Sequence, residues 1–254
     1  MSLRSRIQQW NPGQPPLSIL AYEATRLCAY SVFSWLYDLR IFGADQIPDS
    51  GPLLIVSNHQ SHLDPPLMTM LSRRHQYFMA RSTLFGQPAF AGLIRLMHAI
   101  PLDQSRGDTR SFKTALEHLG LGRLICIFPE GSRSESGAVD EFKPGVGLLI
   151  KRAKVPVVPV AIEGAFDIWP RTQRLPKLRG RIHMKIGPVV AFDELKAAGA
   201  RGSLQLLSER IDAMRLQLRE GLRHQTRGRY PAPGPGDGPS ASVLKGARGS
   251  EPAQ

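Results

Sequence analysis

Two short apolar runs, each followed at once by a polar loop, constrain this chain more than any other feature of its sequence. The runs cover residues 53–56 and 124–128, and the loops contain Asn58 to Asp64 and Phe128 to Ser134. Continuous apolar runs of this length are typical of buried strands. In open α/β sheets, active sites form from polar residues just past the carboxyl ends of strands. The sequence therefore predicts that both loops contribute to one site.

The first loop offers an imidazole with a carboxylate five positions further on, His59 and Asp64. An imidazole suits the role of a general base because its unperturbed pKa of about 6.5 leaves it mostly neutral at pH 7. A neighbouring carboxylate fixes the tautomer of the ring and stabilises the imidazolium that forms. His62 is the rival base, since it is nearer to Asp64 in the sequence. The residues alone leave the choice between the two histidines open.

The second loop combines Glu130, Gly131, Ser132 and Arg133. An arginine can bind a phosphate through two donors of its planar fork, which predicts an anion site. Glu130 cannot itself favour an anion, so we expect it to orient an arginine or to accept a hydrogen bond from a substrate hydroxyl. The alternative is a polar turn with a salt bridge, in which Gly131 supplies only the backbone conformation.

Taken together, these loops resemble motifs of the glycerophospholipid acyltransferases, the lysophosphatidate acyltransferase-like family. His59 and Asp64 match its first motif, and the second loop matches its third, with a serine in place of a threonine. Residues 155–160, Val-Pro-Val-Val-Pro-Val, match its fourth. The second motif is looser, because Gln104 stands where the family often has an arginine and Arg106 follows two residues later. The resemblance covers roughly residues 39–190.

This resemblance implies transfer of a fatty acyl chain from acyl-CoA or acyl carrier protein to the free hydroxyl of a lysophospholipid. The most typical acceptor is 1-acylglycerol-3-phosphate, which would give phosphatidate. His59 would take the hydroxyl proton and Asp64 would hold His59. The implied substrate-binding residues are Arg106, Glu130, Gly131, Ser132 and Arg133. The alternatives are an acyltransferase for another lysolipid, such as a remodelling substrate or a lyso-aminolipid, and a non-catalytic membrane-binding protein.

Apart from these two co-substrates, we expect no cofactor. We also expect no metal, because the remaining histidines show no ligand spacing with each other or with the cysteines. The two cysteines form no disulfide framework, which fits a reducing compartment. The sequence assigns no oligomeric state.

Apolar runs that alternate with helices of about ten residues indicate the α/β class, a single-domain αβ sandwich. By resemblance, a central mixed sheet is flanked by helices. We expect strands at 39–42, 53–56, 77–80, 99–102, 124–128, 155–162 and 182–186. We expect helices at 17–37, 88–97, 108–119, 144–153 and 204–222, with residues 1–16 irregular and Asp64 capping a short helix. The predicted organisation is a membrane-associating segment at 1–38, an acyltransferase domain at 39–224 and a disordered Pro/Gly-rich tail at 225–254.

The chain is strongly basic, with 33 lysines and arginines against 21 acids and a net charge of +12. Such a balance predicts anionic partners. An anionic membrane surface is favoured over nucleic acid, because no nucleic-acid-binding signature is present. The segment 17–39 is long and rich in aromatic residues but contains Glu23, Arg26 and Asp38. It fits either a helix lying in the membrane interface or a helix docked on the core of the domain. With no signal peptide in the polar residues 1–14, we expect a peripheral or monotopic protein on the cytoplasmic face of the cell membrane.

Overall fold

The apolar runs form the central strands of one mixed sheet in the computed structural model, which describes residues 3–102 and 109–239. Within these residues, seven strands pair in the order β1-β7-β6-β2-β5-β3-β4. Neighbouring strands are parallel except for the antiparallel pair β6 and β7. The strands are β1 (Arg40–Phe42), β2 (Leu53–Ser57), β3 (Gln76–Arg81), β4 (Ala99–Leu102), β5 (Leu124–Ile127), β6 (Val157–Glu163) and β7 (His183–Ile186). The predicted α/β class and mixed sheet are confirmed.

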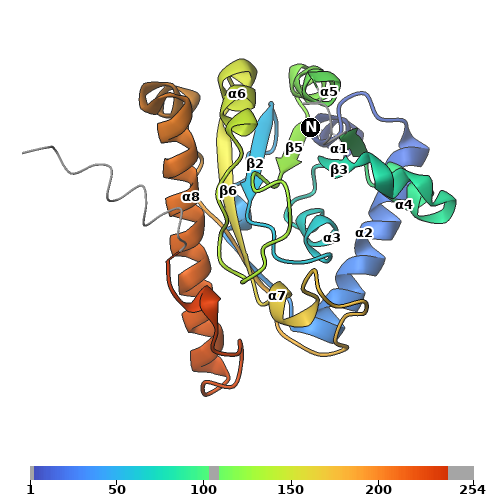
Figure 1. Cartoon of the computed structure of the whole chain (residues 1–254). Helices are drawn as coiled ribbons and strands as arrows, with labels where there is room; N and C mark the ends of the chain where they lie inside the picture. Colours follow the sequence, from blue (N-terminus) through green and yellow to red (C-terminus); the bar gives the residue numbers. More distant parts are fainter. Residues whose placement is uncertain (1–2, 103–108, 240–254) are drawn as a thin grey trace, which may run out of the picture.

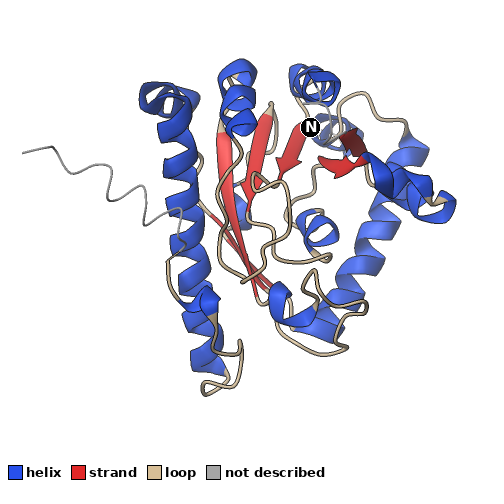
Figure 2. Ribbon diagram, viewed as in Figure 1, coloured by secondary structure: helices blue, strands red, loops and turns tan. Residues whose placement is uncertain are grey.

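Helices cover both faces of the sheet, which explains why its central strands are apolar throughout (Figures 1 and 2). Successive side chains of a strand point to opposite faces. Leu53 and Ile55 therefore pack on α2 (Pro16–Tyr37) and α3 (Asp64–Met68). Leu54 and Val56 pack on the other side, where the helices are α5 (Thr109–Gly120), α6 (Pro144–Ala153) and α8 (Phe192–Gln225). Each aliphatic side chain buried in this way stabilises the fold by about 1.5–3 kcal/mol.

The remaining helices are short: α1 (Leu3–Trp10), α4 (Pro88–Leu96), α7 (Ala165–Ile168) and the 3-10 turns at Ala44–Gln46, Ser82–Gly86 and Pro235–Asp237. The prediction of irregular structure for residues 1–16 was wrong, because α1 occupies half of that stretch. The prolines explain the error. Pro12 lies beyond the end of α1, and Pro15 and Pro16 begin α2, where a proline is well tolerated.

One side of α2 packs on the core and the other side faces outward. Tyr22 and Tyr37 are buried, whereas Leu17 is 78% exposed and Trp35 is 84% exposed. The helix is thus docked on its own domain and still presents an apolar outer surface. Within the described ranges, no helix combines the length and the apolar content needed to cross a bilayer.

The segment predicted to be disordered from residue 225 begins with ordered structure. The final helix, α8, ends at Gln225 and bends at Gly199, and the chain then folds back along it. Arg215 donates to the carbonyl oxygen of Gly236 at 2.6 Å, and Arg219 donates to Asp237 at 2.7 Å. Composition predicted disorder because this segment has little apolar surface to bury, but arginines of α8 bind its polar groups instead. Residues 240–254 of the predicted tail lie outside the described residues.

Candidate active site

The first loop brings an imidazole and a carboxylate into direct contact at the end of β2. His59 Nδ1 lies 2.8 Å from Asp64 Oδ2. The His59 side chain is 17% exposed, whereas that of Asp64 is fully buried. Because the carboxylate accepts a hydrogen bond from Nδ1–H, the second ring nitrogen, Nε2, is left free to accept a proton. The His59 ring stacks on Phe128 with the ring centroids 4.2 Å apart, which limits its rotation.

Asp64 has a different local role from the predicted helix cap. It is the first residue of α3, whose N-cap is Leu63. Its Oδ2 atom also accepts hydrogen bonds from the backbone N–H groups of Gln60 and Ser61, at 2.6 and 2.7 Å. The carboxylate therefore folds the loop around itself and holds His59 in the same step.

His62, the rival base, is in the same loop but makes different contacts. Its ring contacts Trp169, with the centroids 4.7 Å apart. Burial, together with the positive charge of Arg133, lowers the pKa of His62. The structure pairs Asp64 with His59, so the geometry favours His59 as the base.

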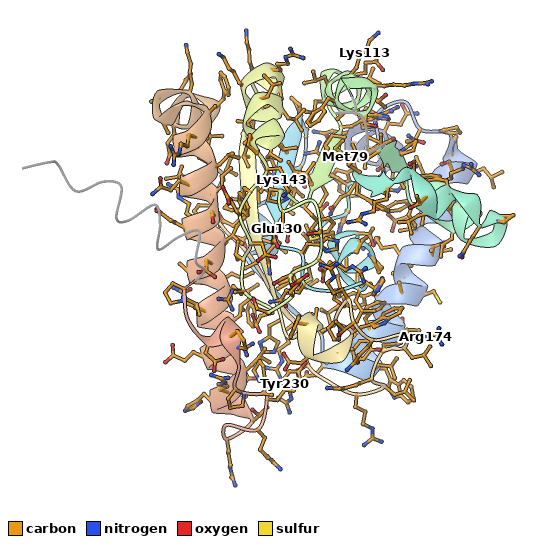
Figure 3. The ribbon with its side chains drawn as sticks, in the orientation of Figure 1. Met79, Lys113, Glu130, Lys143, Arg174 and Tyr230 are labelled. Atoms are coloured by element: carbon orange, nitrogen blue, oxygen red, sulfur yellow. The ribbon has the colours of Figure 1, made fainter. Side chains whose placement is uncertain are left out.

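The second loop lies against the first because β2 and β5 are parallel neighbours, with Leu53 opposite Leu124. The backbone of His59 joins the two loops. Its N–H donates to Glu130 Oε1 at 2.9 Å, and its carbonyl oxygen accepts from Ser134 N–H at 2.7 Å. Glu130 therefore positions the loop that carries His59, a role that we did not predict. Figure 3 shows Glu130 near the centre of the molecule, where burial raises its pKa well above the ordinary value.

Gly131 and Arg133 determine the conformation and the charge of the second loop. Gly131 has a φ of +71°, in the left-handed region that favours glycine. Arg133 is half-buried, and its Nη1 atom has no hydrogen-bond partner in the described part of the chain. Burial, with the nearby charges of Arg171 and Arg81, lowers the pKa of Arg133. Three guanidinium groups thus converge near this loop, and Ser132 beside them is partly exposed.

Arg81 and Arg171 are cations of the site that we did not predict. Arg81 is the last residue of β3, the strand next to β5, and it donates to the carbonyl oxygen of Gly131 at 3.4 Å. The rule that placed the two loops at the carboxyl ends of parallel strands would also have selected Arg81. Arg171 follows α7, and no comparable signal marked it. Arg106, predicted as a second phosphate contact, lies outside the described residues.

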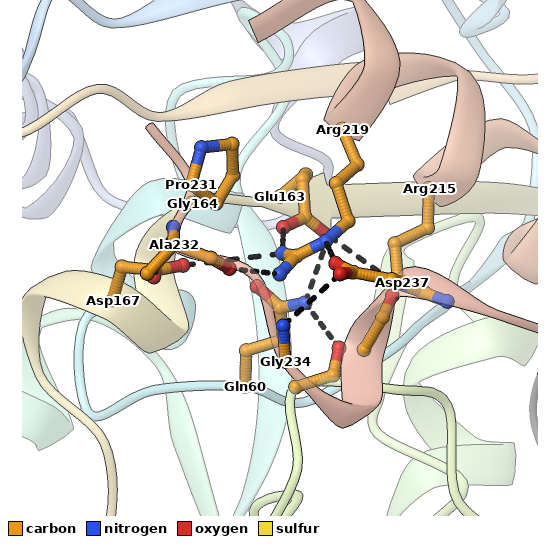
Figure 4. Close-up of polar contacts among 12 residues, drawn as sticks. Gln60, Glu163, Gly164, Asp167, Arg215, Arg219, Pro231, Ala232, Gly234 and Asp237 are labelled. Carbon is orange, nitrogen blue, oxygen red and sulfur yellow. Dashed lines mark hydrogen bonds and ion pairs between the residues drawn. The ribbon is translucent and has the colours of Figure 1, made fainter. Parts of the chain in front are cut away.

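Two side chains of the first loop connect it to β6, the strand that carries the fourth motif. Asn58 forms two hydrogen bonds with the backbone of Ile162, one to the carbonyl oxygen at 2.9 Å and one from the N–H at 2.8 Å. Gln60 Nε2 donates to the carbonyl oxygen of Gly137 at 2.6 Å and to Glu163 Oε2 at 3.1 Å. Figure 4 shows Gln60 at the edge of a group of charged residues around Glu163. The loop that carries His59 is therefore held from β5 and from β6.

These contacts define an α/β protein with a histidine–carboxylate pair and a cationic loop at the carboxyl edge of its sheet. The Acyltransferase family model matches residues 38–163, and the chain belongs to this family.

Individual relatives agree with this assignment. A chloroplastic 1-acyl-sn-glycerol-3-phosphate acyltransferase of Brassica napus is 35% identical over 53% of this chain and 40% of its own length. The 1-acyl-sn-glycerol-3-phosphate acyltransferase of Streptococcus pneumoniae is 27% identical over 74% of this chain and 69% of its own length. The chain thus spans less than half of the Brassica napus relative.

A solved structure is also similar. The crystal structure of the 1-acyl-sn-glycerophosphate acyltransferase from Thermotoga maritima superposes with a TM-score of 0.67 at 25% identity. The match covers 83% of this chain and 81% of that one.

Proposed function

We propose that this protein transfers a fatty acyl group from a thioester donor to the free hydroxyl of a lysophospholipid, with 1-acylglycerol-3-phosphate as the preferred acceptor. The observation that carries the proposal is the buried Nη1 of Arg133, which has no partner among the described residues and lies in the loop that also fixes His59. A buried charged donor without a partner is costly, and a substrate phosphate would supply the missing acceptor. The names of the relatives support the choice of acceptor.

The proton would move through His59. Its Nε2 takes the proton of the acceptor hydroxyl as the hydroxyl oxygen bonds to the thioester carbon, and Asp64 stabilises the imidazolium. The carbon–sulfur bond then breaks, and the departing thiolate takes the proton from His59. The nucleophile is the substrate itself, so no acyl-enzyme forms. Holding donor and acceptor together replaces an encounter in solution, which is a large part of the rate enhancement.

The proposed partners are a lysophospholipid acceptor, an acyl thioester donor and an anionic membrane surface. Either acyl-CoA or acyl carrier protein fits the donor role. The exposed side of α2 and the charge of +12 support a peripheral position on the membrane, which we place on the cytoplasmic face.

The test is a thiol-release assay with acyl-CoA or acyl carrier protein as donor and a panel of lysolipids as acceptors. We expect release with lysophosphatidate that exceeds release with lysolipids lacking an exposed phosphate monoester. Equal release across the panel would assign the protein to another lysolipid. If none of the acceptors causes thiol release but the protein binds vesicles, the protein is a non-catalytic membrane-binding protein.

A further inference from the structure

A basic loop, residues 170–181, joins α7 to β7 and is mostly exposed. It contains two leucines that contact water rather than the core, Leu175 at 78% exposure and Leu178 at 72%. No aspartate or glutamate occurs between residues 168 and 192. The loop contains five cationic residues, which are Arg171, Arg174, Lys177, Arg179 and Arg181.

Most of this charge is not neutralised by the protein. Arg171 pairs with Glu135 at 2.8 Å, and Arg181 pairs with Asp38 at 3.4 Å. Across residues 3–102 and 109–239, no carboxylate lies within 4.0 Å of the charged groups of Arg174, Lys177 or Arg179. Figure 3 shows Arg174 at the outer edge of the molecule, pointing away from the body of the fold. The middle of the loop is therefore a cationic surface available to an anionic partner.

The loop begins at the candidate site. Trp169, which precedes it, accepts a hydrogen bond from Ser61 Oγ at its carbonyl oxygen, at 2.8 Å. Its ring lies against His62, which follows His59 by three residues in the same short loop. Arg171 is also close enough to Arg133 to influence its pKa. Any surface that binds the basic loop therefore lies beside the site.

The other end of the loop meets the apolar helix α2. The N–H of Ile182 donates to the carbonyl oxygen of Tyr37, the last residue of α2, at 2.9 Å. Trp35, in the last turn of α2, is 84% exposed. The basic loop is thus continuous with the exposed apolar side of α2, and it links that side to the site (Figure 1).

We propose that the basic loop is a lipid-binding element that docks on an anionic bilayer. Leu175 and Leu178 enter the membrane interface, and the cations beside them bind lipid phosphates. This combination favours a bilayer over a soluble polyanion, because a soluble polyanion would use the charges and leave both leucines in water. The inference rests on the proposed function for the identity of the substrate and adds a second membrane contact, at the rim of the site, to that of α2.

The test is flotation of the full chain with phosphatidylcholine vesicles that contain or lack phosphatidylglycerol. The charge variant is Arg174→Gln/Lys177→Gln/Arg179→Gln, which leaves Arg171 beside the site intact. The matched control is Lys151→Gln/Arg152→Gln/Lys154→Gln, which removes the same charge at the C-terminal end of α6, just before β6 begins, whereas the basic loop lies beyond the other end of that strand. One cation near an anionic surface is worth roughly fivefold in binding, so the charge variant should bind on the order of 100-fold more weakly at low salt.

The leucines are tested separately. Leu175→Ser/Leu178→Ser should weaken binding by an amount that persists at high salt, because burial of apolar surface is not screened. Leu121→Ser/Leu148→Ser, two exposed leucines elsewhere, is the control and should bind like the parent. The proposal is wrong if the loop variants bind phosphatidylglycerol vesicles as tightly as their controls. It is also wrong if vesicle binding is unchanged and only the KM for acyl carrier protein rises, since the loop would then dock an acidic protein.

Activity measurements separate this proposal from the proposed function. With a short-chain lysophosphatidate that stays monomeric in water, the loop variants should keep the parental turnover. With the acceptor embedded in anionic vesicles, their rate should fall in step with binding. If the parent transfers no acyl group to any acceptor, the proposed function fails, whereas the flotation comparison still decides the role of the loop.

Discussion

The candidate site and the charged network around Glu163 lie on either side of Gln60 and contain the same kinds of groups. They differ in whether the buried polar atoms of these groups have hydrogen-bond partners within the protein. In the network, no buried side-chain atom of Glu163, Arg215 or Arg219 lacks a hydrogen-bond partner within the described part of the chain. In the site, several buried polar atoms lack one. These atoms are Gln60 Oε1, Asp64 Oδ1, Glu130 Oε2 and Arg133 Nη1.

The network is a set of ion pairs (Figure 4), and among its described charged side chains only Asp167 has a buried atom without a hydrogen-bond partner, Oδ2, which lies 4.0 Å from Arg219 Nη1. Glu163 is fully buried, with Arg219 Nη1 at 2.6 Å and Arg215 Nη1 at 3.5 Å from its oxygens. Burial disfavours the charge of Arg219, but the carboxylates of Glu163 and Asp237 outweigh it and raise the pKa of Arg219. Burial also raises the pKa of Glu163, against the two arginines. The short contact with Arg219 favours the ionised pair.

The difference separates a structural role from a binding role. An unpaired buried polar group costs about 1–3 kcal/mol, so a fold keeps several together only where something offsets them. In the network the offset is internal, because residues 232–238 supply carbonyl oxygens and a carboxylate to α8. In the site it would come from the substrates. Substitutions in the network should therefore change stability, and substitutions in the site should change activity.

The largest expected effect is at the base. His59→Ala should lower turnover by about 10²–10⁴-fold, the usual contribution of a general base. Its free energy of unfolding should fall only modestly, because Asp64 keeps the backbone N–H donors of Gln60 and Ser61. The control is His62→Ala, which should keep most of the turnover. Steady-state kinetics and urea denaturation of both variants would test this, and the reverse ranking of the two histidines would assign the base to His62.

Asp64→Asn should also lower turnover, up to the same 10²–10⁴-fold range, with little change in acceptor KM. An amide can present its NH₂ group to Nδ1 and so favour the wrong tautomer of His59. The NH₂ group in that position would no longer accept hydrogen bonds from the N–H groups of Gln60 and Ser61, so we also expect a modest loss of stability. Parental turnover in a folded Asp64→Asn protein would limit Asp64 to organising the loop.

In the network, Glu163→Gln should lower the free energy of unfolding by about 3–5 kcal/mol, because Arg215 and Arg219 would lose their buried carboxylate. Any molecules that remain folded should keep a normal acceptor KM. Urea denaturation measures the first quantity, and kinetics at a temperature where the variant is folded measures the second. A stable Glu163→Gln protein with a strongly raised KM would mean that the network belongs to the binding site.

The sheet and the histidine–carboxylate pair of the site could be predicted from the sequence, whereas the network around Glu163 could not, and the reason is physical. The central strands begin and end within two residues of their predicted bounds, because burial on both faces requires continuous apolar runs. The pairing of His59 with Asp64 is local and was predicted. The contact of Glu130 with the His59 backbone depends on β2 lying beside β5, which spacing along the chain does not reveal. The ordered conformation of residues 226–239 likewise depends on contacts with arginines of α8, which the composition of the segment alone does not reveal.

A smaller effect is expected at the phosphate contact. Arg133→Lys replaces a planar fork by a point charge, so it should weaken acceptor binding by about 10- to 100-fold, the equivalent of one charge-assisted bond of roughly 1.5–3 kcal/mol. The donor KM should barely change. The control is Arg152→Lys, an exposed arginine of α6. Two-substrate kinetics decides the matter, and a changed donor KM with an unchanged acceptor KM would assign the second loop to the thioester carrier.

The smallest effect should come from Glu130→Gln, the counterpart of Glu163→Gln in the site. Burial raises the pKa of Glu130 well above its ordinary value, so the folded protein retains a proton that the unfolded chain releases above about pH 4.3. Stability from this group is fully present below the unfolded pKa and is lost as the pH rises through the folded pKa. Glutamine keeps an acceptor for the His59 N–H and does not titrate. The variant should therefore match the parent in urea at pH 4 and become the more stable of the two as the pH rises, while its turnover falls by far less than 10²-fold. A parent that gains stability over the variant with rising pH would show that Glu130 is ionised in the fold, and that the site contains a buried charge paired like that of Glu163.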